Sequence, residues 1–315
     1  MITFANGKID MNSITASRGM VTGIALGLTL LLPTITPAAE STLTIASHGQ
    51  KLAATVNLPD DVEMPPVVLM LHGFTGQRNE TPSPVDGTGL YTLMAAALAE
   101  AGIASLRIDF AGSGESTGAW VETTFTGQIA DAVAAFDFLQ AHGAVDSSRI
   151  GVLGYSQGGL VGAHLAGLRP EVSAVALWAP VTNPLRTYAG ILGSDAVETA
   201  LRAPADQPVT APMSWGGETT LNARFFHELV TVDPVAAIAG YPGPLAIMAG
   251  LRETIVTPQP LAAEVLLNYH EGPEVLITID SDHGWNWEEA KSVVEEHLAP
   301  ATVDWFTTRL IGAAE

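Results

Sequence analysis

Short apolar runs alternate along this chain with longer stretches in which apolar residues recur at helical spacing. Each run is bounded by glycine, proline or polar residues and is short enough to form a buried strand. The runs are Pro66–Leu71, Ile103–Phe110, Arg149–Tyr155, Val172–Ala179, Leu245–Ala249 and Glu274–Asp280. Strands that alternate with helices are typical of a parallel sheet covered on both faces. The pattern therefore predicts an α/β fold with a mostly parallel central sheet and helices on both faces.

Two further segments modify this picture. Ser41–Ser47 and Lys51–Pro59 flank His48-Gly49-Gln50, which predicts an antiparallel hairpin added at the sheet edge. Residues 182–231 separate two predicted strands by more than a simple crossover. Within them lie Tyr188, Trp215, Phe225 and Phe226. We expect a small cap insertion there, whose aromatic side chains either line a substrate pocket or only pack the cap onto the body. The catalytic domain is expected to cover residues 40–315.

The first residues have the composition of a secretory signal. Val21–Leu32 is apolar and is followed by the small-residue tract Thr36-Pro37-Ala38-Ala39. The apolar run is about a dozen residues, short of the roughly 20 that a membrane-spanning helix needs. We therefore predict a signal peptide over residues 1–39, cleaved near Ala38 or Ala39, and a secreted or periplasmic protein without a stable membrane anchor. Met1, Met11 and Met20 are all candidate starts.

Charge and cysteine content narrow the classes of partner. The chain has 33 acidic and 13 basic residues, a formal net charge of −20. Such a chain repels phosphate backbones, so nucleic acid is not expected as a partner. The acidic surface fits either an ordinary exported enzyme or adaptation to salt. Because the chain contains no cysteine, disulfides, a lipid-modified N-terminal cysteine and a thiol nucleophile are all excluded.

The most specific motif is Gly154-Tyr155-Ser156-Gln157-Gly158, which lies between a predicted strand and a predicted helix. This context is typical of a nucleophilic serine on a tight turn, where a side chain at either glycine would collide with neighbouring backbone. A second match, Gly114–Gly118, lies in a loop with no helix pattern after its serine, Ser116. We therefore assign Ser156 as the nucleophile and expect Ser116 to be structural.

A serine nucleophile needs an imidazole to accept its proton and a carboxylate to orient that imidazole. In an open α/β sheet these groups follow the carboxyl ends of strands. His283 directly follows the last predicted strand, and Glu253 is the only carboxylate in the loop 250–258 after the preceding one. We predict Ser156, Glu253 and His283 as the catalytic residues. Asp280 and Asp282 are the competing acids, and an Arg252-paired surface role is the alternative for Glu253.

The oxyanion that forms on attack needs backbone N–H donors already aimed at it. We expect one from Gln157, at the start of the helix after the nucleophile. The other is expected from Phe74 in the glycine-containing loop His72–Gly76, which follows the first core strand. No two histidines have metal-ligand spacing on one helix, so neither a metal nor a cofactor is predicted.

Together these motifs resemble the α/β-hydrolases, in particular the branch of cinnamoyl and feruloyl esterases and related small serine esterases. The resemblance covers about residues 40–312 and rests on His72–Gly76, Ile108–Ser116, Gly154–Gly159, Gly250–Val256 and Asp282–Gly284. It implies an α/β-hydrolase fold. The chain departs from the family in two places: Glu253 replaces the usual aspartate, and Ser113 stands where the family's loop often has histidine.

The predicted function is that of a secreted serine carboxylic ester hydrolase that works through an acyl-enzyme. Its substrate is expected to be a small-molecule ester with a short-chain or aromatic acyl group, including the feruloyl and cinnamoyl type. One alternative is an acyltransferase or peptidase that uses the same residues. Another is a non-catalytic binding protein that keeps only the fold. Turnover with and without added alcohol separates hydrolysis from acyl transfer.

Overall fold

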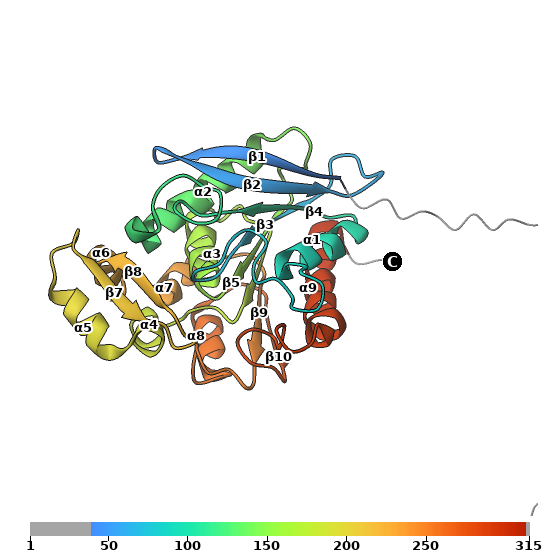
Figure 1. The fold of residues 1–315 in the computed structure, drawn as a ribbon. Helices are drawn as coiled ribbons and strands as arrows, with labels where there is room; N and C mark the ends of the chain where they lie inside the picture. Colours follow the sequence, from blue (N-terminus) through green and yellow to red (C-terminus); the bar gives the residue numbers. More distant parts are fainter. Residues whose placement is uncertain (1–38, 313–315) are drawn as a thin grey trace, which may run out of the picture. The chain divides into compact units, whose positions relative to one another are not determined.

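The computed structural model describes residues 39–312, so the predicted signal peptide lies outside the described residues apart from Ala39. Its main feature is a mixed eight-stranded sheet of order β1-β2-β4-β3-β5-β6-β9-β10 (Figure 1). The strands are β1 (Ala39–Ser47), β2 (Gln50–Leu58), β3 (Val67–Leu71), β4 (Ala104–Ile108), β5 (Ile150–Tyr155), β6 (Ala174–Trp178), β9 (Leu245–Gly250) and β10 (Glu274–Ile279). From β4 to β10 all neighbours are parallel. β1 and β2 are antiparallel and occupy one edge. The predicted sheet and its edge hairpin are confirmed.

Two predicted strands, Ile103–Phe110 and Val172–Ala179, are each three residues longer than the observed β4 and β6. The apolar run Ile103–Phe110 suggests a strand to its end, yet β4 stops at Ile108. Asp109 and Phe110 are fully buried like strand residues, but they begin a loop. Asp109 is held by polar contacts, as described below, whereas Phe110 packs in the hydrophobic core. Hydrophobic pattern alone does not distinguish such buried loop residues from strand residues.

Helices cover both faces of the sheet, as predicted, because alternate residues of the core strands point to opposite sides. Val68 and Met70 pack in one hydrophobic cluster with α1 and α9, whereas Leu69 and Leu71 pack in the other with α2 and α3. The helices outside the insertion are α1 (Leu90–Glu100), α2 (Phe125–Ala141), α3 (Gln157–Leu168), α7 (Pro234–Ala239), α8 (Leu261–Tyr269) and α9 (Ala299–Phe306). Shorter helical turns are η1 (Trp120–Glu122), η2 (Val294–Leu298) and η3 (Thr307–Ile311). Among residues 39–312, no helix combines the length and apolarity needed to cross a membrane.

The segment predicted as a cap folds into its own small group of elements between β6 and β9 (Figure 1). They are α4 (Pro184–Leu192), α5 (Ser194–Arg202), the antiparallel pair β7 (Pro208–Pro212) and β8 (Glu218–Asn222), and α6 (Ala223–Glu228). Tyr188, Phe225 and Phe226 are fully buried, and Trp215 is 50% exposed. Phe225 stacks on Phe125 of the body, and Tyr188 packs edge to face against the same ring. Three of the four aromatics therefore pack the segment, while only Trp215 remains available to a ligand.

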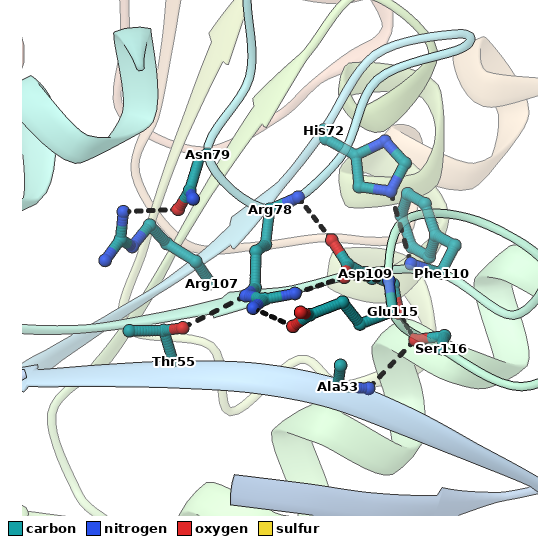
Figure 2. A network of polar contacts seen from close by, with 10 residues as sticks. All are labelled: Ala53, Thr55, His72, Arg78, Asn79, Arg107, Asp109, Phe110, Glu115 and Ser116. Carbon is teal, nitrogen blue, oxygen red and sulfur yellow. Dashed lines mark hydrogen bonds and ion pairs between the residues drawn. The ribbon is translucent and has the colours of Figure 1, made fainter. Parts of the chain in front are cut away.

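A buried ion pair fixes the loops at the carboxyl edge of the sheet (Figure 2). The backbone N–H of Arg78 donates to Asp109 Oδ1 at 2.6 Å, and its guanidinium pairs with Asp109 and Glu115. Its Nε also donates to Thr55 Oγ1 at 3.1 Å. A buried charge is tolerated only when it is paired and hydrogen-bonded, and Arg78 meets both conditions. The network ties the loop after β3 to β2 and to the loop after β4.

Ser116 belongs to the same network, which explains the second serine motif. Its hydroxyl donates to Asp109 O at 2.7 Å and accepts the Ala53 N–H at 2.9 Å (Figure 2). A Cβ at Gly114 would lie 2.2 Å from Asp109 Oδ2, so the glycine is required by the carboxylate beside it. The motif is therefore a structural loop, as expected.

His72 is a buried neutral histidine at the end of β3. It is 1% exposed, and its Nε2 accepts the Phe110 N–H at 3.2 Å (Figure 2). Its Nδ1 lies 2.9 Å from Gly73 O and therefore carries the proton that it donates. Burial lowers the pKa of His72 to about 4. The neutral ring thus serves as a hydrogen-bonded link between two loops.

This burial makes stability depend on pH. The unfolded chain, with an ordinary histidine pKa of about 6.5, takes up a proton that folded His72 resists, so stability falls as the pH falls from about 6.5 towards 4. When the pH falls from about 6.5 to about 4.5, the unfolding free energy of the wild type should therefore fall by about 2 kcal/mol more than that of His72→Gln. Urea unfolding at both pH values measures it, with the exposed His297→Gln as the control. Parallel pH dependences in wild type and His72→Gln would contradict a buried neutral His72.

Candidate active site

Ser156 lies at the tight turn between β5 and α3. Its backbone has φ 54° and ψ −113°, a left-handed conformation that is costly for a residue with a side chain. The Ser156 backbone donates to Trp178 O at 2.8 Å and accepts from Val181, which holds it against the neighbouring strand. The residue is 6% exposed, and its hydroxyl does not cap α3. The hydroxyl is thereby left for other partners.

The glycines of this turn are required by space. A Cβ at Gly154 would lie 2.3 Å from Gly158 O, and one at Gly158 would lie 2.0 Å from Leu71 O. Real Cβ atoms do not approach backbone oxygen this closely. The predicted collision with neighbouring strand and helix backbone is confirmed at both positions. The start of α3 consequently lies directly against the end of β3.

His283 follows β10 and reaches Ser156. The distance between His283 Nε2 and Ser156 Oγ is 3.0 Å, within hydrogen-bond range. The backbone of the histidine loop is held by Tyr155, whose hydroxyl donates to His283 O at 2.9 Å. The Trp287 indole, also in that loop, donates to Thr81 O at 2.8 Å. His283 is thus positioned by residues next to the serine and by the loop after β3.

Glu253 lies after β9, on the far side of the imidazole from Ser156. Its Oε2 is 2.6 Å from His283 Nδ1, and its Oε1 accepts the N–H groups of Ile255 and Val256 at 2.6 and 3.1 Å. The side chain of Glu253 has no exposed surface. A carboxylate at Nδ1 fixes the proton there, so Nε2 is left as the acceptor facing Ser156. The structure brings Ser156, His283 and Glu253 into one continuous chain of contacts.

The competing acids have other partners. Asp280 pairs with Arg252 at 2.9 Å, and its side chain is 82% exposed. Asp282 accepts the Asn286 N–H at 2.8 Å and so orders the histidine loop, as expected for a turn residue. Arg252 therefore pairs with Asp280, which removes the alternative of an Arg252-paired surface role for Glu253.

The two predicted backbone donors both border the serine. Gln157 is the first residue of α3, where N–H groups have no partner within the helix. Its side chain is fully buried, accepts from the Tyr188 hydroxyl and donates to Gln128. Phe74 belongs to the loop whose Gly73 Cβ position would lie 3.5 Å from Ser156 Cβ. Among the described residues, neither the Phe74 nor the Gln157 N–H donates to another protein group.

A cavity of about 460 Å³ opens at Ser156 and His283. Phe74, Ile191 and Trp215 form part of its apolar wall. Its lining also contains the acidic side chains Glu80, Asp282, Glu288 and Glu289, and it contains no lysine or arginine. Within residues 39–312, no group of three or more histidine, aspartate or glutamate side chains is arranged to hold a metal ion. The cavity is of a size for a small molecule.

Sequence reasoning missed Glu80, a buried carboxylate of this cavity. Glu80 is 4% exposed, and its Oε1 accepts the Gly73 N–H. Burial raises the pKa of Glu80 to about 7, although the hydrogen bonds that its carboxylate accepts act in the opposite direction. Its position a few residues beyond the loop His72–Gly76 is the only sequence signal, and it does not show that the side chain turns back under that loop.

Comparison with known proteins agrees with this architecture. A model of the alpha/beta hydrolase fold matches residues 66–206. An uncharacterized 31.7 kDa protein of Escherichia coli, from the traX-finO intergenic region, is 31% identical over 111 residues, or 35% of this chain. The matched stretch spans only 36% of that relative's length.

Two solved structures are similar over most of the chain. Est1E from Butyrivibrio proteoclasticus, solved with ferulic acid bound, has a TM-score of 0.68 at 22% identity. That match covers 86% of this chain and 100% of Est1E. The esterase domain of a Rhodothermus marinus protein has a TM-score of 0.61 at 24% identity and covers 85% of this chain and 99% of that domain. Together with the strand order, these matches confirm the predicted resemblance: the chain has the α/β-hydrolase fold.

Proposed function

We propose that this chain is a serine carboxylic ester hydrolase that works through an acyl-enzyme at Ser156. The observation that carries the proposal is the uninterrupted contact from Ser156 Oγ through His283 to the buried Glu253. Such an arrangement makes a serine hydroxyl nucleophilic at neutral pH. The other candidates have different partners: Ser116 bonds to Asp109, Asp280 pairs with Arg252, and Asp282 accepts the Asn286 N–H, which supports the choice of Ser156 and Glu253.

In the proposed reaction, Ser156 Oγ attacks the ester carbonyl while His283 Nε2 takes its proton. Glu253 stabilises the resulting imidazolium without being protonated itself. The carbonyl oxygen becomes an oxyanion, which accepts hydrogen bonds from the N–H groups of Phe74 and Gln157. His283 then protonates the leaving alcohol, and water repeats the sequence to release the acid. Ser156, His283 and Phe74 line the cavity, and Glu253 reaches His283 from its buried side.

The substrate is proposed to be a small neutral ester with a short-chain or aromatic acyl group. Phe74, Ile191 and Trp215 offer apolar contacts, while the acidic lining disfavours an anionic substrate. The structure of Est1E with ferulic acid bound is consistent with an aromatic acyl group. Hydrolysis of p-nitrophenyl esters from acetate to palmitate, compared with methyl ferulate, tests this choice, and added alcohol reveals any acyl transfer.

We also propose that the protein is exported. The apolar run Val21–Leu32 and the small residues before Glu40 support cleavage near Ala38 or Ala39. Since β1 begins at Ala39, a chain that starts near Ala39 or Glu40 keeps the whole sheet. N-terminal sequencing of material from the periplasm or medium should give that start. Full-length chain found only in the cytoplasm would contradict export.

Ser156→Ala should reduce ester hydrolysis by about 10³-fold or more without unfolding the protein, because only the backbone donors and substrate binding remain. Ser116→Ala is the matched control. It removes two structural hydrogen bonds, so it should lower the melting temperature while kcat stays close to wild type. Substantial activity in folded Ser156→Ala, or loss of kcat in folded Ser116→Ala, would contradict the assignment.

Glu253→Gln should lower kcat by roughly 10²- to 10⁴-fold with little change in KM, because the lost interaction stabilises an imidazolium present mainly in the transition state. The kcat of Glu253→Asp should lie between those of the wild type and Glu253→Gln, since the shorter side chain weakens the contact but keeps the charge. Asp280→Asn, whose carboxylate pairs only with Arg252, is the control and should leave kcat unchanged. A larger loss in Asp280→Asn or Asp282→Asn than in Glu253→Gln would show that the acid comes from the histidine loop.

A further inference from the structure

The carboxylate of Glu80 lies directly against the loop that carries Phe74. Its Oε1 accepts the Gly73 N–H. A Cβ at Gly76 would lie 2.9 Å from Oε1 and 3.2 Å from Oε2 of the same carboxylate. Gly76 therefore leaves room for this side chain, whereas a Cβ at Gly73 would make an ordinary contact of 3.5 Å with Oε1. The proposed reaction assigns no role to Glu80.

The peptide after Gly73 is held by other groups. Its carbonyl oxygen accepts from His72 Nδ1 at 2.9 Å and from the Gly76 N–H at 3.1 Å. In a trans peptide the N–H points opposite to the carbonyl, so these bonds also fix the direction of the Phe74 N–H. The peptide before Gly73 has its N–H fixed by Glu80 alone. Within the described residues, Glu80 thus supplies the acceptor that the Gly73 N–H does not find in the loop itself.

Glu80 itself is held firmly by the backbone on either side. Its N–H donates to Gln77 O at 2.8 Å, and its φ of 58° turns the chain back under the loop. Arg78, two residues earlier, is bonded to Asp109, and the carbonyl oxygen of the next residue, Thr81, accepts from the Trp287 indole in the histidine loop. Because the backbone around Glu80 is fixed in this way, its carboxylate holds the Gly73 N–H in one position.

We propose that Glu80 is a positioning residue whose carboxylate, by accepting the Gly73 N–H, holds the peptide before Gly73 in place, and with it the position of the Phe74 N–H that the bonds to Gly73 O orient. The inference rests on the proposed acyl transfer at Ser156. Glu80 lines the cavity, but the polar contact that the proposal uses is with the backbone of the loop, so its effect on the transition state is exerted through that loop. Loss of one oxyanion donor costs about 10²- to 10³-fold in kcat, which sets the scale expected.

The test compares Glu80→Leu, which removes the acceptor, with Glu80→Gln, which keeps an amide oxygen for the Gly73 N–H. With p-nitrophenyl butyrate, Glu80→Leu should lower kcat by about 10²-fold with KM within about 3-fold, and Glu80→Gln should recover most of the loss. Affinity for a trifluoromethyl ketone, which forms a tetrahedral oxyanion on the serine, should fall in parallel with kcat. Amide hydrogen exchange at residues 73–76 should accelerate in Glu80→Leu only.

Asp131 provides the matched control for a buried carboxylate. It is fully buried and accepts the Ala111 N–H at 2.8 Å, but it does not line the cavity. Asp131→Leu and Asp131→Asn should lower the melting temperature and leave kcat and inhibitor affinity unchanged. A purely structural Glu80 would behave in the same way as Asp131.

The outcomes separate this inference from the proposed function. Unchanged kcat and inhibitor affinity in folded Glu80→Leu, or equal losses in Glu80→Leu and Glu80→Gln, would overturn the role of Glu80. Unchanged exchange at residues 73–76 would overturn it even if the wild type hydrolysed no ester. A wild-type protein that neither hydrolyses esters nor is labelled at Ser156 by a fluorophosphonate would overturn the proposed function instead. If Glu80→Leu fails to fold, slowed turnover with faster exchange in Glu80→Ala supports the proposal, and wild-type values overturn it.

Discussion

The close approach of α3 to the end of β3 is the constraint on which the site depends. With only 2.0 Å between a Cβ at position 158 and Leu71 O, no side chain fits, and the helix begins where the strand ends. This contact puts Ser156 in its left-handed conformation and brings the loop after β3 next to it. The first N–H of α3 and that of Phe74 can then serve one oxyanion. A single steric requirement therefore places the nucleophile and both proposed donors.

Buried polar contacts hold the loops around this point, in addition to the hydrophobic packing of side chains such as Phe74 and Trp287. Arg78 with Asp109, His72 with Phe110, and Trp287 with Thr81 each join two loops that follow different strands. Burying such groups costs free energy unless their bonds are complete, so each complete set has one favoured geometry. The free energy lost on desolvating these groups makes the contacts poor sources of stability. Because that free energy is recovered only in the geometry that completes every bond, the contacts are suitable for fixing the position of a loop.

The sequence predicted those parts of the fold and site that depend on local pattern and on order along the chain. The strands, the edge hairpin and the serine turn follow from short windows of residues. His283 and Glu253 follow from the rule that functional groups succeed the carboxyl ends of strands, and the structure brings both to Ser156. Catalysis by these residues remains a prediction for the experiments above. The first two residues of the loop after β4 were predicted as strand because a buried Asp109 and a buried Phe110 are indistinguishable from strand residues by pattern.

Contacts between loops could not be predicted in this way, since they depend on which strands become neighbours. Arg78 meets Asp109 only because β3 and β4 are adjacent and in register, and Glu80 reaches Gly73 only because the chain reverses beyond Gly76. The two buried carboxylates near the imidazole illustrate the result. Glu253 contacts the His283 ring itself, whereas Glu80 accepts a backbone N–H of the loop after β3. What distinguishes an acid that takes part in proton transfer from one that shapes the loop is therefore the atom each contacts, which tertiary structure determines and residue type does not.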